Sequence, residues 1–541
     1  MHGARSLTGA AVAAIALLSG SPAAGAAVPE TTAAVGWASS AGAAVARDVV
    51  LPPGARLTPR VPRGPWALSF TLAAPPGAVL RITGPGAARL GDLRARPDGR
   101  LAVRGASGTR APRALGARAW THRVELVRDR LTVDGVRVGR GTGGAVTLTS
   151  TGGAAPVRIT ALTTTPTGRR DALLLHRLGD LRARTPDGRF PLGEGPDGRL
   201  RFSGGWTSGF WPGALWEAAR LVPGGPYGGW ALDASLARLG GEGTPIHDVG
   251  FMFGRSVVVA FERRCPAAAA ATARCRTLRA SGLAAADTLV RLAGTAATGM
   301  VPTDATGPEA DTIVDSLMNL GLLTWATRVS GDARYAALAR THATTLVGLV
   351  QRPDGSTIQL AVHDRATGAL LRRGTRQGLS DTSTWARGQA WAIYGLAAVG
   401  RDLRDAGLVA AAERAAAFWI ARAPAAGPPP YDLTAGARAP RDSSAAAIAA
   451  AGMVRLARAC AAVPGACSTP TRWRAAAGAT LDTALTAVST VPPLGRLGDQ
   501  AYTVGPRNGS WDDRAELVWG LDFALEAVAE RALSATGART S

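Results

Sequence analysis

The hydrophobic periodicity of the chain changes at about residue 170, and this change divides the sequence into two predicted domains. From about Gly36 to Thr165, short runs alternate between apolar and polar residues and are separated by Gly and Pro. A period of two is typical of strands with one buried face. The pattern therefore predicts an all-β sandwich of the jelly-roll type over residues 30–165, either a glycan-binding or a spacer domain.

The clearest hairpin in this first domain spans Thr121 to Val138. Val124 and Leu126 alternate with charged residues before a polar turn, and Asp134-Gly135 separates two further apolar runs. Asp-Gly is a favoured pair for a two-residue hairpin turn, because both residues tolerate positive φ. We therefore expect Asp134-Gly135 to turn a hairpin.

After about Arg170, apolar residues recur at spacings of three and four, as in Thr312 to Val329 and Trp385 to Val399. These spacings place apolar side chains on one face of a helix, and Gly- and Pro-containing turns separate the segments. Residues 170–535 could hold about a dozen helices of average length with their connections. We expect an all-α domain that fits an (α/α)6 toroid with a ligand cavity at one end.

The N-terminus has the pattern of a signal peptide over residues 1–26. An arginine precedes the apolar run from Leu7 to Leu18, and small residues lead up to Ala26. The run is too short to cross a bilayer, which takes about 20 apolar residues, and no later stretch is both long and uncharged. We expect cleavage near Ala26, a secreted protein and no membrane span.

Four cysteines form two close pairs, Cys265 with Cys275 and Cys460 with Cys467. An exported chain normally oxidises such neighbours, so two local disulfides are predicted. The short ligand spacings of zinc sites are absent from these pairs, and we expect neither a metal nor an organic cofactor.

The formal net charge of +22 raises the question of nucleic-acid binding. Phosphate binding depends on clustered basic residues, whereas the arginines of this chain are scattered and lysine is absent. We therefore expect no nucleic-acid partner. A positive field would still attract anionic ligands to the surface.

Four segments of the second domain combine aromatic residues with carboxylate, amide or guanidinium groups, which is unusual for helices that only form a core. A sugar site needs a flat apolar face, polar groups for hydroxyls and an acid for proton transfer. The segments are Trp206 to Gly213, His247 to Phe251, Asp315 to Asn319 and Trp385 to Trp391.

Taken in order, these segments resemble the unsaturated glucuronyl hydrolase family, a family of glycoside hydrolases. Further matches lie at Gln377, at Arg441 to Ser444 and near Gly520 to Ala527, and the resemblance covers roughly Arg170 to Arg531. It implies the toroid fold and hydrolysis of oligosaccharides with a 4,5-unsaturated uronic acid at the non-reducing end. Such anionic fragments are products of polysaccharide lyases.

The resemblance implies that Asp315 is the catalytic acid and base and that Asp248 is a second catalytic aspartate. Helical spacing would place Asp311, Asp315 and Asn319 on one polar stripe, in agreement with that role for Asp315. Burial beside indoles and beside Asp248 would raise the pKa of Asp315. Asp248 has an alternative role as the N-cap of a helix beginning near Gly250.

The same resemblance implies substrate binding by three further side chains. Trp206 and Trp391 are expected to stack on sugar rings, and Arg387 to pair with the uronate carboxylate. Trp211 and Trp385 are expected to belong to the core.

Two glutamines complete the expected binding set. Gln377 matches a glutamine of the family site, whereas Gln359 stands where the family commonly has a histidine. Glutamine donates and accepts hydrogen bonds but carries no proton charge, so we expect a change in substrate preference rather than in reaction type.

Two alternatives stay open at this point. A non-catalytic secreted glycan-binding protein would have Gln359 as the mark of a lost activity. A related unsaturated rhamnogalacturonyl hydrolase is the second, although the motif from Trp385 to Trp391 favours the glucuronyl enzymes. The sequence sets no oligomeric state.

Overall fold

A computed structural model describes the β-strands between residues 37 and 166 and most of the chain from residue 170 to 535. Within that second range, residues 267–271, 306, 468–469, 491–492 and 503–514 are outside the described part. The predicted signal peptide, residues 1–26, also lies outside the described residues.

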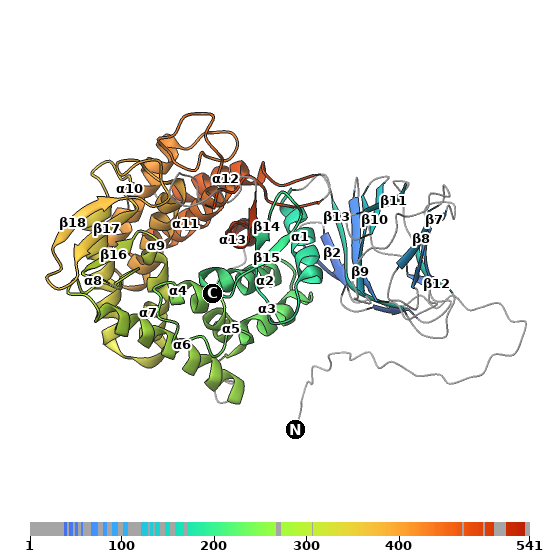
Figure 1. The fold of residues 1–541 in the computed structure, drawn as a ribbon, viewed down its shortest axis with the longest axis horizontal. Helices are drawn as coiled ribbons and strands as arrows, with labels where there is room; N and C mark the ends of the chain where they lie inside the picture. The colour runs from blue at the N-terminus through green and yellow to red at the C-terminus, as the bar shows by residue number, and fades with distance from the viewer. Residues whose placement is uncertain are drawn as a thin grey trace, which may run out of the picture.

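The strands between residues 37 and 166 form two antiparallel sheets (Figure 1). The larger has the order β1-β2-β13-β5-β9-β10-β11, with β3 also paired to β13, and the smaller has the order β4-β12-β6-β7-β8. The strands are β1 Trp37–Ser40, β2 Ala43–Ala46, β3 Val49–Leu51, β4 Arg56–Leu57, β5 Trp66–Ala73, β6 Val79–Thr83, β7 Arg89–Ala95, β8 Leu101–Gly105, β9 Thr121–Val127, β10 Arg130–Val133, β11 Val136–Arg140, β12 Thr147–Thr151 and β13 Val157–Pro166.

The predicted hairpin is confirmed by the strand register. Strand β10 pairs antiparallel with β11, and Val133 lies opposite Val136. Asp134 and Gly135, the residues predicted to turn this hairpin, lie outside the described residues.

From Arg170 onward the chain forms an inner and an outer layer of helices. The inner layer comprises α2 Phe210–Leu221, preceded by the 3₁₀ turn η2 Trp206–Gly209, then α4 Val249–Gly254 with α5 Val257–Arg264, α7 Ser316–Ser330, α9 Ala386–Asp402, α11 Ser443–Ala462 and α13 Val518–Ala535. The outer layer comprises α1 Arg170–Arg184, α3 Tyr227–Leu236, α6 Ala273–Ala293, α8 Ala333–Val350, α10 Ala406–Arg422 and α12 Pro470–Leu485.

The inner helices form a closed ring, visible in Figure 1. Helix α4 contacts η2 and α7, α7 contacts α9, α9 contacts α11, α11 contacts α13, and α13 contacts α2. Each outer helix packs on an inner neighbour, for example α8 on α7 and α12 on α11. Alternation of inner and outer helices around a closed ring is the α/α toroid that the sequence pattern predicts.

Local sequence signals set several helix ends in this ring. The carboxylates of Asp332, Asp405 and Asp442 accept backbone N–H groups in the first turns of α8, α10 and α11, which satisfies donors that a helix leaves unpaired. Helix α7 ends at Ser330, and the next residue, Gly331, has a φ of 78°. That left-handed conformation is accessible to glycine at little cost.

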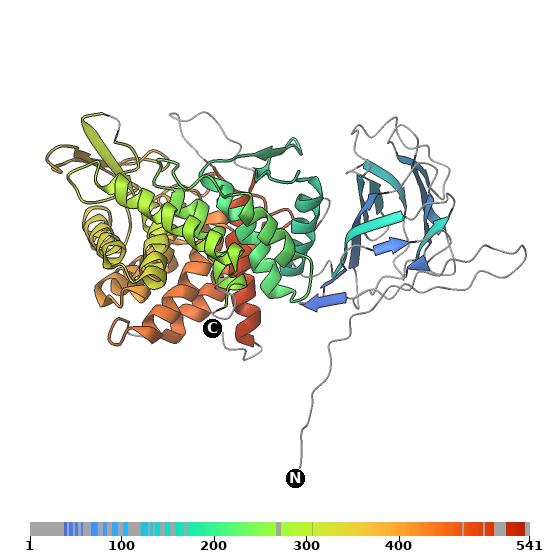
Figure 2. The same ribbon diagram turned by 90° about the horizontal axis from the view of Figure 1, so that it is seen from below.

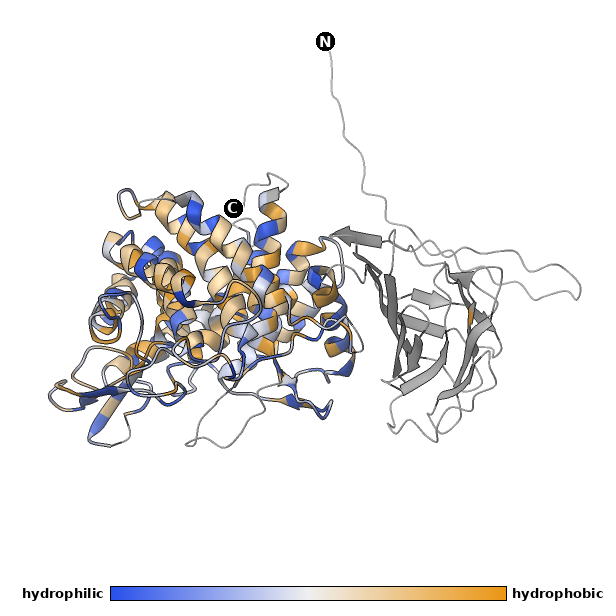
Figure 3. Ribbon diagram, turned by 90° about the horizontal axis from the view of Figure 1, so that it is seen from above, coloured by the Kyte–Doolittle hydropathy of each residue, from blue (hydrophilic) through white to orange (hydrophobic). Residues whose placement is uncertain are grey.

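The ring has a continuous apolar core, and Figure 3 shows apolar residues concentrated on the packed helices. Helix α11 is strongly apolar, and every residue from Ala445 to Ala451 is buried. Within the described part of the chain, α11 alone has the length and composition to cross a membrane, and 72% of its most apolar window is buried inside the protein. Burial of this kind is typical of a core helix.

Two small sheets lie at one end of the ring, and Figure 2 shows them on the side opposite the end of α13. One contains β15 Leu200–Phe202, β14 Pro191–Glu194 and β19 Glu516–Leu517. The other contains β16 Glu309–Ile313, β17 Leu360–Asp364 and β18 Leu370–Gly374.

The predicted helix from Thr312 to Val329 begins too early. Thr312 and Ile313 belong to β16, where they pair with Ala361 and Leu360, and the helix starts only at Ser316. β-branched residues such as threonine and isoleucine fit a pleated, partly buried strand, and pairing with β17 decides the conformation here.

Both predicted disulfides are present. Cys265–Cys275 links the end of α5 to the first turn of α6, and Cys460–Cys467 ties the end of α11 to the loop that follows it. The described part of the chain holds no free cysteine.

Candidate active site

Four of the predicted site residues lie where the inner helices begin. Trp206 opens the turn before α2, Asp248 and Asp315 directly precede α4 and α7, and Arg387 is in the first turn of α9. Helix N-termini carry unpaired N–H groups and a partial positive charge. A ring of such ends favours an anionic ligand.

Asp315 is a buried carboxyl group in this region. It occupies the N-cap position of α7 but accepts no hydrogen bond from that helix, and its Oδ2 is buried without a partner in the described part of the chain. Burial raises the pKa of Asp315 to about 7, and the negative charge of Asp248 acts in the same direction, whereas Arg387 lowers it. A carboxyl group with this pKa can give and take a proton near neutral pH.

Asp248 is held beside Asp315 by a short polar chain. Asn319 Nδ2 donates to Asp248 Oδ1 at 3.1 Å, and Asn319 Oδ1 accepts from the backbone N–H of Phe251 at 2.6 Å. His247 Nε2 lies 3.3 Å from Asp248 Oδ2, and His247 Nδ1 lies 3.0 Å from Ser316 Oγ. The expected N-cap position of Asp248 is correct, but its side chain accepts no helix N–H and contacts Asn319 instead.

The predicted polar stripe of Asp311, Asp315 and Asn319 is wrong. Asp311 lies on β16 and forms an ion pair with Arg376, while Asp315 precedes α7 and Asn319 is on it. Because the backbone is extended up to Ile313, helical spacing does not apply across this segment. Asn319 nevertheless joins the site, through Asp248.

Arg387 is buried and pairs within the protein. Its Nη1 donates to Asp442 Oδ2 at 2.7 Å and to the Ala501 carbonyl at 2.6 Å, and its Nη2 donates to the Tyr502 carbonyl at 2.6 Å. Its guanidinium also lies 4.6 Å from the ring centroid of Trp385. Arg387 therefore orients the segment at residues 501–502, and pairing with a uronate stays a prediction.

Gln359 organises the loop that carries Gln377. Gln359 Oε1 accepts from Thr375 Oγ1 at 2.7 Å and from the backbone N–H groups of Arg376 at 2.7 Å and Gln377 at 2.9 Å. Its Nε2 donates to Gln377 Oε1 at 2.6 Å, and Gln377 Nε2 reaches the Tyr502 carbonyl at 3.3 Å. Both glutamines thus lie beside the segment that Arg387 holds.

The two predicted stacking tryptophans occupy different environments. Trp206 is partly exposed and lies next to Trp519, Tyr502 and Phe251, with ring centroids 5.0, 6.5 and 5.9 Å away. Trp391 is fully buried, so its ring offers no face for a sugar. The indole N–H of Trp391 lies near the Asp315 carboxyl group and lowers its pKa, although the two groups do not meet the geometry of a hydrogen bond.

The core assignments of Trp211 and Trp385 are confirmed, since the two side chains are 2% and 4% exposed. Asp442 and Trp519 were not predicted as site residues. Asp442 lies inside the matched segment from Arg441 to Ser444 but was given no role, and Trp519 directly precedes the matched segment from Gly520 to Ala527. Among the described residues, no three His, Cys, Asp or Glu side chains gather as metal ligands.

Comparison with known proteins adds independent information. No family model matches the chain. An unsaturated glucuronyl hydrolase of Bacillus sp. (strain GL1) is 34% identical over 266 residues, 47% of this chain and 67% of the relative. An unsaturated chondroitin disaccharide hydrolase of Streptococcus pyogenes serotype M1 is 31% identical over 256 residues, and the match spans 46% of this chain and only 62% of the relative.

Solved structures agree with these relatives. The structure of an unsaturated glucuronyl hydrolase specific for heparin superposes with a TM-score of 0.58 at 26% identity, over 69% of this chain and 98% of that chain. The enzyme of Bacillus sp. GL1 gives 0.57 at 26% identity, over 67% and 94%.

The α/α toroid, the buried carboxyl group of Asp315 and these relatives together place the chain among the glycoside hydrolases. The chain belongs to the unsaturated glucuronyl hydrolase family.

Proposed function

We propose that this protein hydrolyses oligosaccharides that carry a 4,5-unsaturated uronic acid at the non-reducing end. The observation that carries the proposal is Asp315, a buried carboxyl with a pKa of about 7 and an unpartnered oxygen, next to Asp248 at the convergence of helix N-termini. The relatives named for glucuronyl and chondroitin disaccharide substrates support this substrate class.

In the proposed mechanism, protonated Asp315 gives its proton to C4 of the vinyl ether, and positive charge develops at C5 and the ring oxygen. Water then adds at C5 while the Asp315 carboxylate takes one of its protons. This proton returns the carboxyl to its starting state. The hemiketal then opens by cleavage of the bond between C5 and the ring oxygen, and the hemiacetal left at C1 collapses to an aldehyde and releases the remaining saccharide as an alcohol. The negative charge of Asp248 stabilises the positive charge at C5, whereas the helix N-termini favour the carboxylate of the uronic acid. No leaving group is displaced directly at the anomeric carbon.

The substrate would be an anionic fragment released by a polysaccharide lyase. Incubation with unsaturated disaccharides tests the proposal, because turnover destroys the conjugated double bond and its ultraviolet absorbance. We expect the absorbance to fall with first-order dependence on enzyme. Binding of the disaccharide with unchanged absorbance would contradict hydrolysis and favour a glycan-binding protein.

Asp248→Asn tests the electrostatic coupling of the two aspartates. The rate requires protonated Asp315, so it should fall as pH rises through the pKa of Asp315, which is about 7 in the parent. Removing the negative charge of Asp248 lowers that pKa, so the alkaline limb of the pH–rate profile should move to lower pH. The introduced asparagine keeps a side-chain oxygen that can accept the hydrogen bond from Asn319 Nδ2.

Asp311→Asn is the matched control for that experiment, because Asp311 lies on β16 with Arg376 as its ion-pair partner. Its alkaline limb should stay at the parental pH. If the alkaline limb of the Asp248→Asn profile stayed at the parental pH or moved to higher pH, electrostatic coupling between Asp248 and Asp315 would be disproved.

For the segment before the helical domain, we propose a jelly-roll-like β-sandwich appended to the hydrolase. Support comes from the two antiparallel sheets between residues 37 and 166. We further propose export with cleavage near Ala26, supported by the N-terminal pattern and by the two disulfides. N-terminal sequencing of the protein from culture medium tests export directly.

A further inference from the structure

A cavity of about 330 Å³, separate from the candidate active site, lies between the end of α2, the loop that leads to α3 and the end of α5. Trp216, Arg220, Gly228, Arg263 and Arg264 are among its lining residues. Trp206 and Asp248 mark the N-terminal ends of the same inner segments, so this cavity is at the opposite end of the ring from the active site. A water molecule takes about 30 Å³ of liquid, so the cavity can hold a group much larger than a simple ion.

Arg264 is an exposed cation at this cavity whose guanidinium group has two contacts within the protein. Its Nη2 donates to the Gly228 carbonyl at 2.6 Å, and its guanidinium lies 5.3 Å from the ring centroid of Trp216. The Trp216 indole is itself anchored by a 3.1 Å hydrogen bond from Nε1 to Ser235 Oγ. A guanidinium held in place before binding loses less entropy when an anion arrives.

The positive charge of this cavity is not neutralised locally. Within the described part of the chain, neither Arg263 nor Arg264 forms an ion pair, and both are exposed. Arg220, at the cavity wall, differs because it pairs with Glu217 at 2.6 Å and with Glu530 at 2.5 Å.

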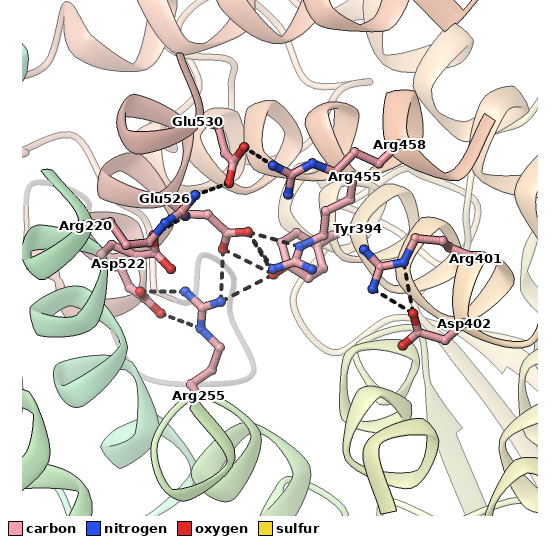
Figure 4. A network of polar contacts seen from close by, with 11 residues as sticks. Arg220, Arg255, Tyr394, Arg401, Asp402, Arg455, Arg458, Asp522, Glu526 and Glu530 are labelled. Atoms are coloured by element: carbon pink, nitrogen blue, oxygen red, sulfur yellow. Dashed lines mark hydrogen bonds and ion pairs between the residues drawn. The ribbon is translucent and has the colours of Figure 1, made fainter. Parts of the chain in front are cut away.

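The neighbouring charge network in Figure 4 provides the contrast. Its arginines each face a carboxylate, for example Arg255 with Asp522 at 2.6 Å and Arg455 with Glu526 at 2.7 Å. Paired arginines of this kind stabilise the packing of the inner helices. Arg263 and Arg264 lack such partners among the described residues, and they point to a ligand that brings the negative charge.

We infer that this cavity is a second binding site, remote from catalysis, for a sulfate or carboxylate group of an acidic oligosaccharide. Two guanidinium groups match such an anion, and the cavity volume leaves space for part of the sugar ring. Nucleic acid fits less well, since phosphate backbones are bound by extended rows of cations rather than one cavity. The choice of a saccharide rests on the proposed function, whereas the anion site itself does not.

The test uses the full-length protein and a sulfated chondroitin octasaccharide with a saturated non-reducing end, which the hydrolase cannot turn over. Calorimetric titration should show affinity about tenfold or more weaker for Arg263→Ala/Arg264→Ala than for the parent, because charge-assisted hydrogen bonds are lost. Arg263→Ala alone, which removes no anchoring contact, should give a smaller loss of the same sign. Hydrolysis of an unsaturated disaccharide should be unchanged in both variants.

Arg472→Ala/Arg474→Ala is the matched control. Both arginines are exposed on α12, neither has an ion pair in the described part of the chain, and Arg472 lies 5.2 Å from the Trp473 ring centroid. This variant removes the same charge, so its affinity should stay within about twofold of the parent.

Equal losses in the two double variants would assign binding to the overall positive field and overturn the proposal. Parental affinity in Arg263→Ala/Arg264→Ala would do the same. So would full displacement of the octasaccharide by inorganic sulfate at equal anion concentration, or equal affinity for a single-stranded DNA oligonucleotide of matched charge. Absent disaccharide hydrolysis in the parent would refute the proposed function only, because the binding comparison does not depend on turnover.

Discussion

Asp315→Asn is expected to lower turnover of an unsaturated disaccharide by about 10²- to 10⁴-fold, the usual contribution of a positioned general acid–base. Asn keeps the shape of the side chain but has no proton to give to C4. Because the shape of the site is retained, the dissociation constant of the disaccharide should change little. Steady-state rates and equilibrium binding of the same disaccharide measure the two effects separately.

The pH dependence of stability provides a second test of the titration of Asp315. The folded-state pKa of Asp315, about 7, is above its usual value of 3.8, so between these values the native protein holds a proton that the unfolded chain releases. Stability of the parent should therefore fall as pH rises from about 4 to 7. Asp315→Asn lacks this dependence. The melting temperature of the variant, relative to that of the parent, should therefore rise as pH increases over this range. Near-parental turnover by Asp315→Asn would show that another group supplies the proton.

The general location of the site could be predicted from the sequence, because its residues cluster in short motifs. Trp206, Asp248, Asp315 and Arg387 each belong to a segment rich in aromatic and charged residues, and the fold brings all four to the starts of inner helices. Helical periodicity predicted the helices of this domain, because each helix must bury one apolar face, and the family resemblance implied their arrangement as a toroid.

The local geometry of Asp315 could not be predicted in the same way. The apolar spacing of Thr312 to Leu317 fits a helix, but pairing with β17, a strand nearly fifty residues away, makes the first part of this segment extended. Periodicity within a short window contains no information about such a partner.

Contacts distant in sequence also decide the roles of Arg387 and Gln359. Arg387 is held by Asp442 and by the carbonyls of Ala501 and Tyr502, which follow it by 55 to 115 residues. Gln359 replaces an expected histidine, and its amide is occupied by the loop at residues 375–377. Residue type alone suggested ligand contacts for both side chains, whereas the fold adds a structural function to each.

Glu526→Ala is expected to destabilise the helical domain by about 3–5 kcal/mol, the cost of breaking a buried ion pair by removing one partner. Glu526 is 3% exposed and lies on α13, in the centre of the network in Figure 4. Its Oε1 accepts from Arg455 Nη2 at 2.7 Å, its Oε2 accepts from Arg255 Nη1 at 2.9 Å, and the Tyr394 hydroxyl donates to it at 3.1 Å. Alanine would remove the counter-charge of the partly buried Arg455 and one of the two carboxylates that pair with Arg255, which keeps Asp522.

Two control variants, Glu526→Gln and Asp482→Ala, separate the loss of the buried charge in Glu526→Ala from the loss of side-chain volume and from the loss of an exposed charge. Gln retains the volume and one acceptor, so it should lose less stability than Ala. Asp482 pairs with Arg531 at the surface, where its side chain is 68% exposed, and its loss should cost only about 0–1 kcal/mol. Urea denaturation followed by far-ultraviolet circular dichroism measures all three variants against the parent.

The pH dependence of these differences has a definite sign. Burial disfavours the charge of Glu526, but Arg455 and Arg255 overcome this effect and lower its pKa to about 2, below the usual value of 4.5. The charge therefore contributes stability above about pH 4.5, and that contribution is lost as pH falls towards 2. The gap between the parent and Glu526→Gln should be largest near neutral pH and shrink under acid conditions. A gap that is small at neutral pH, or equal to that of Asp482→Ala, would mean that desolvation of the network cancels its ion pairing.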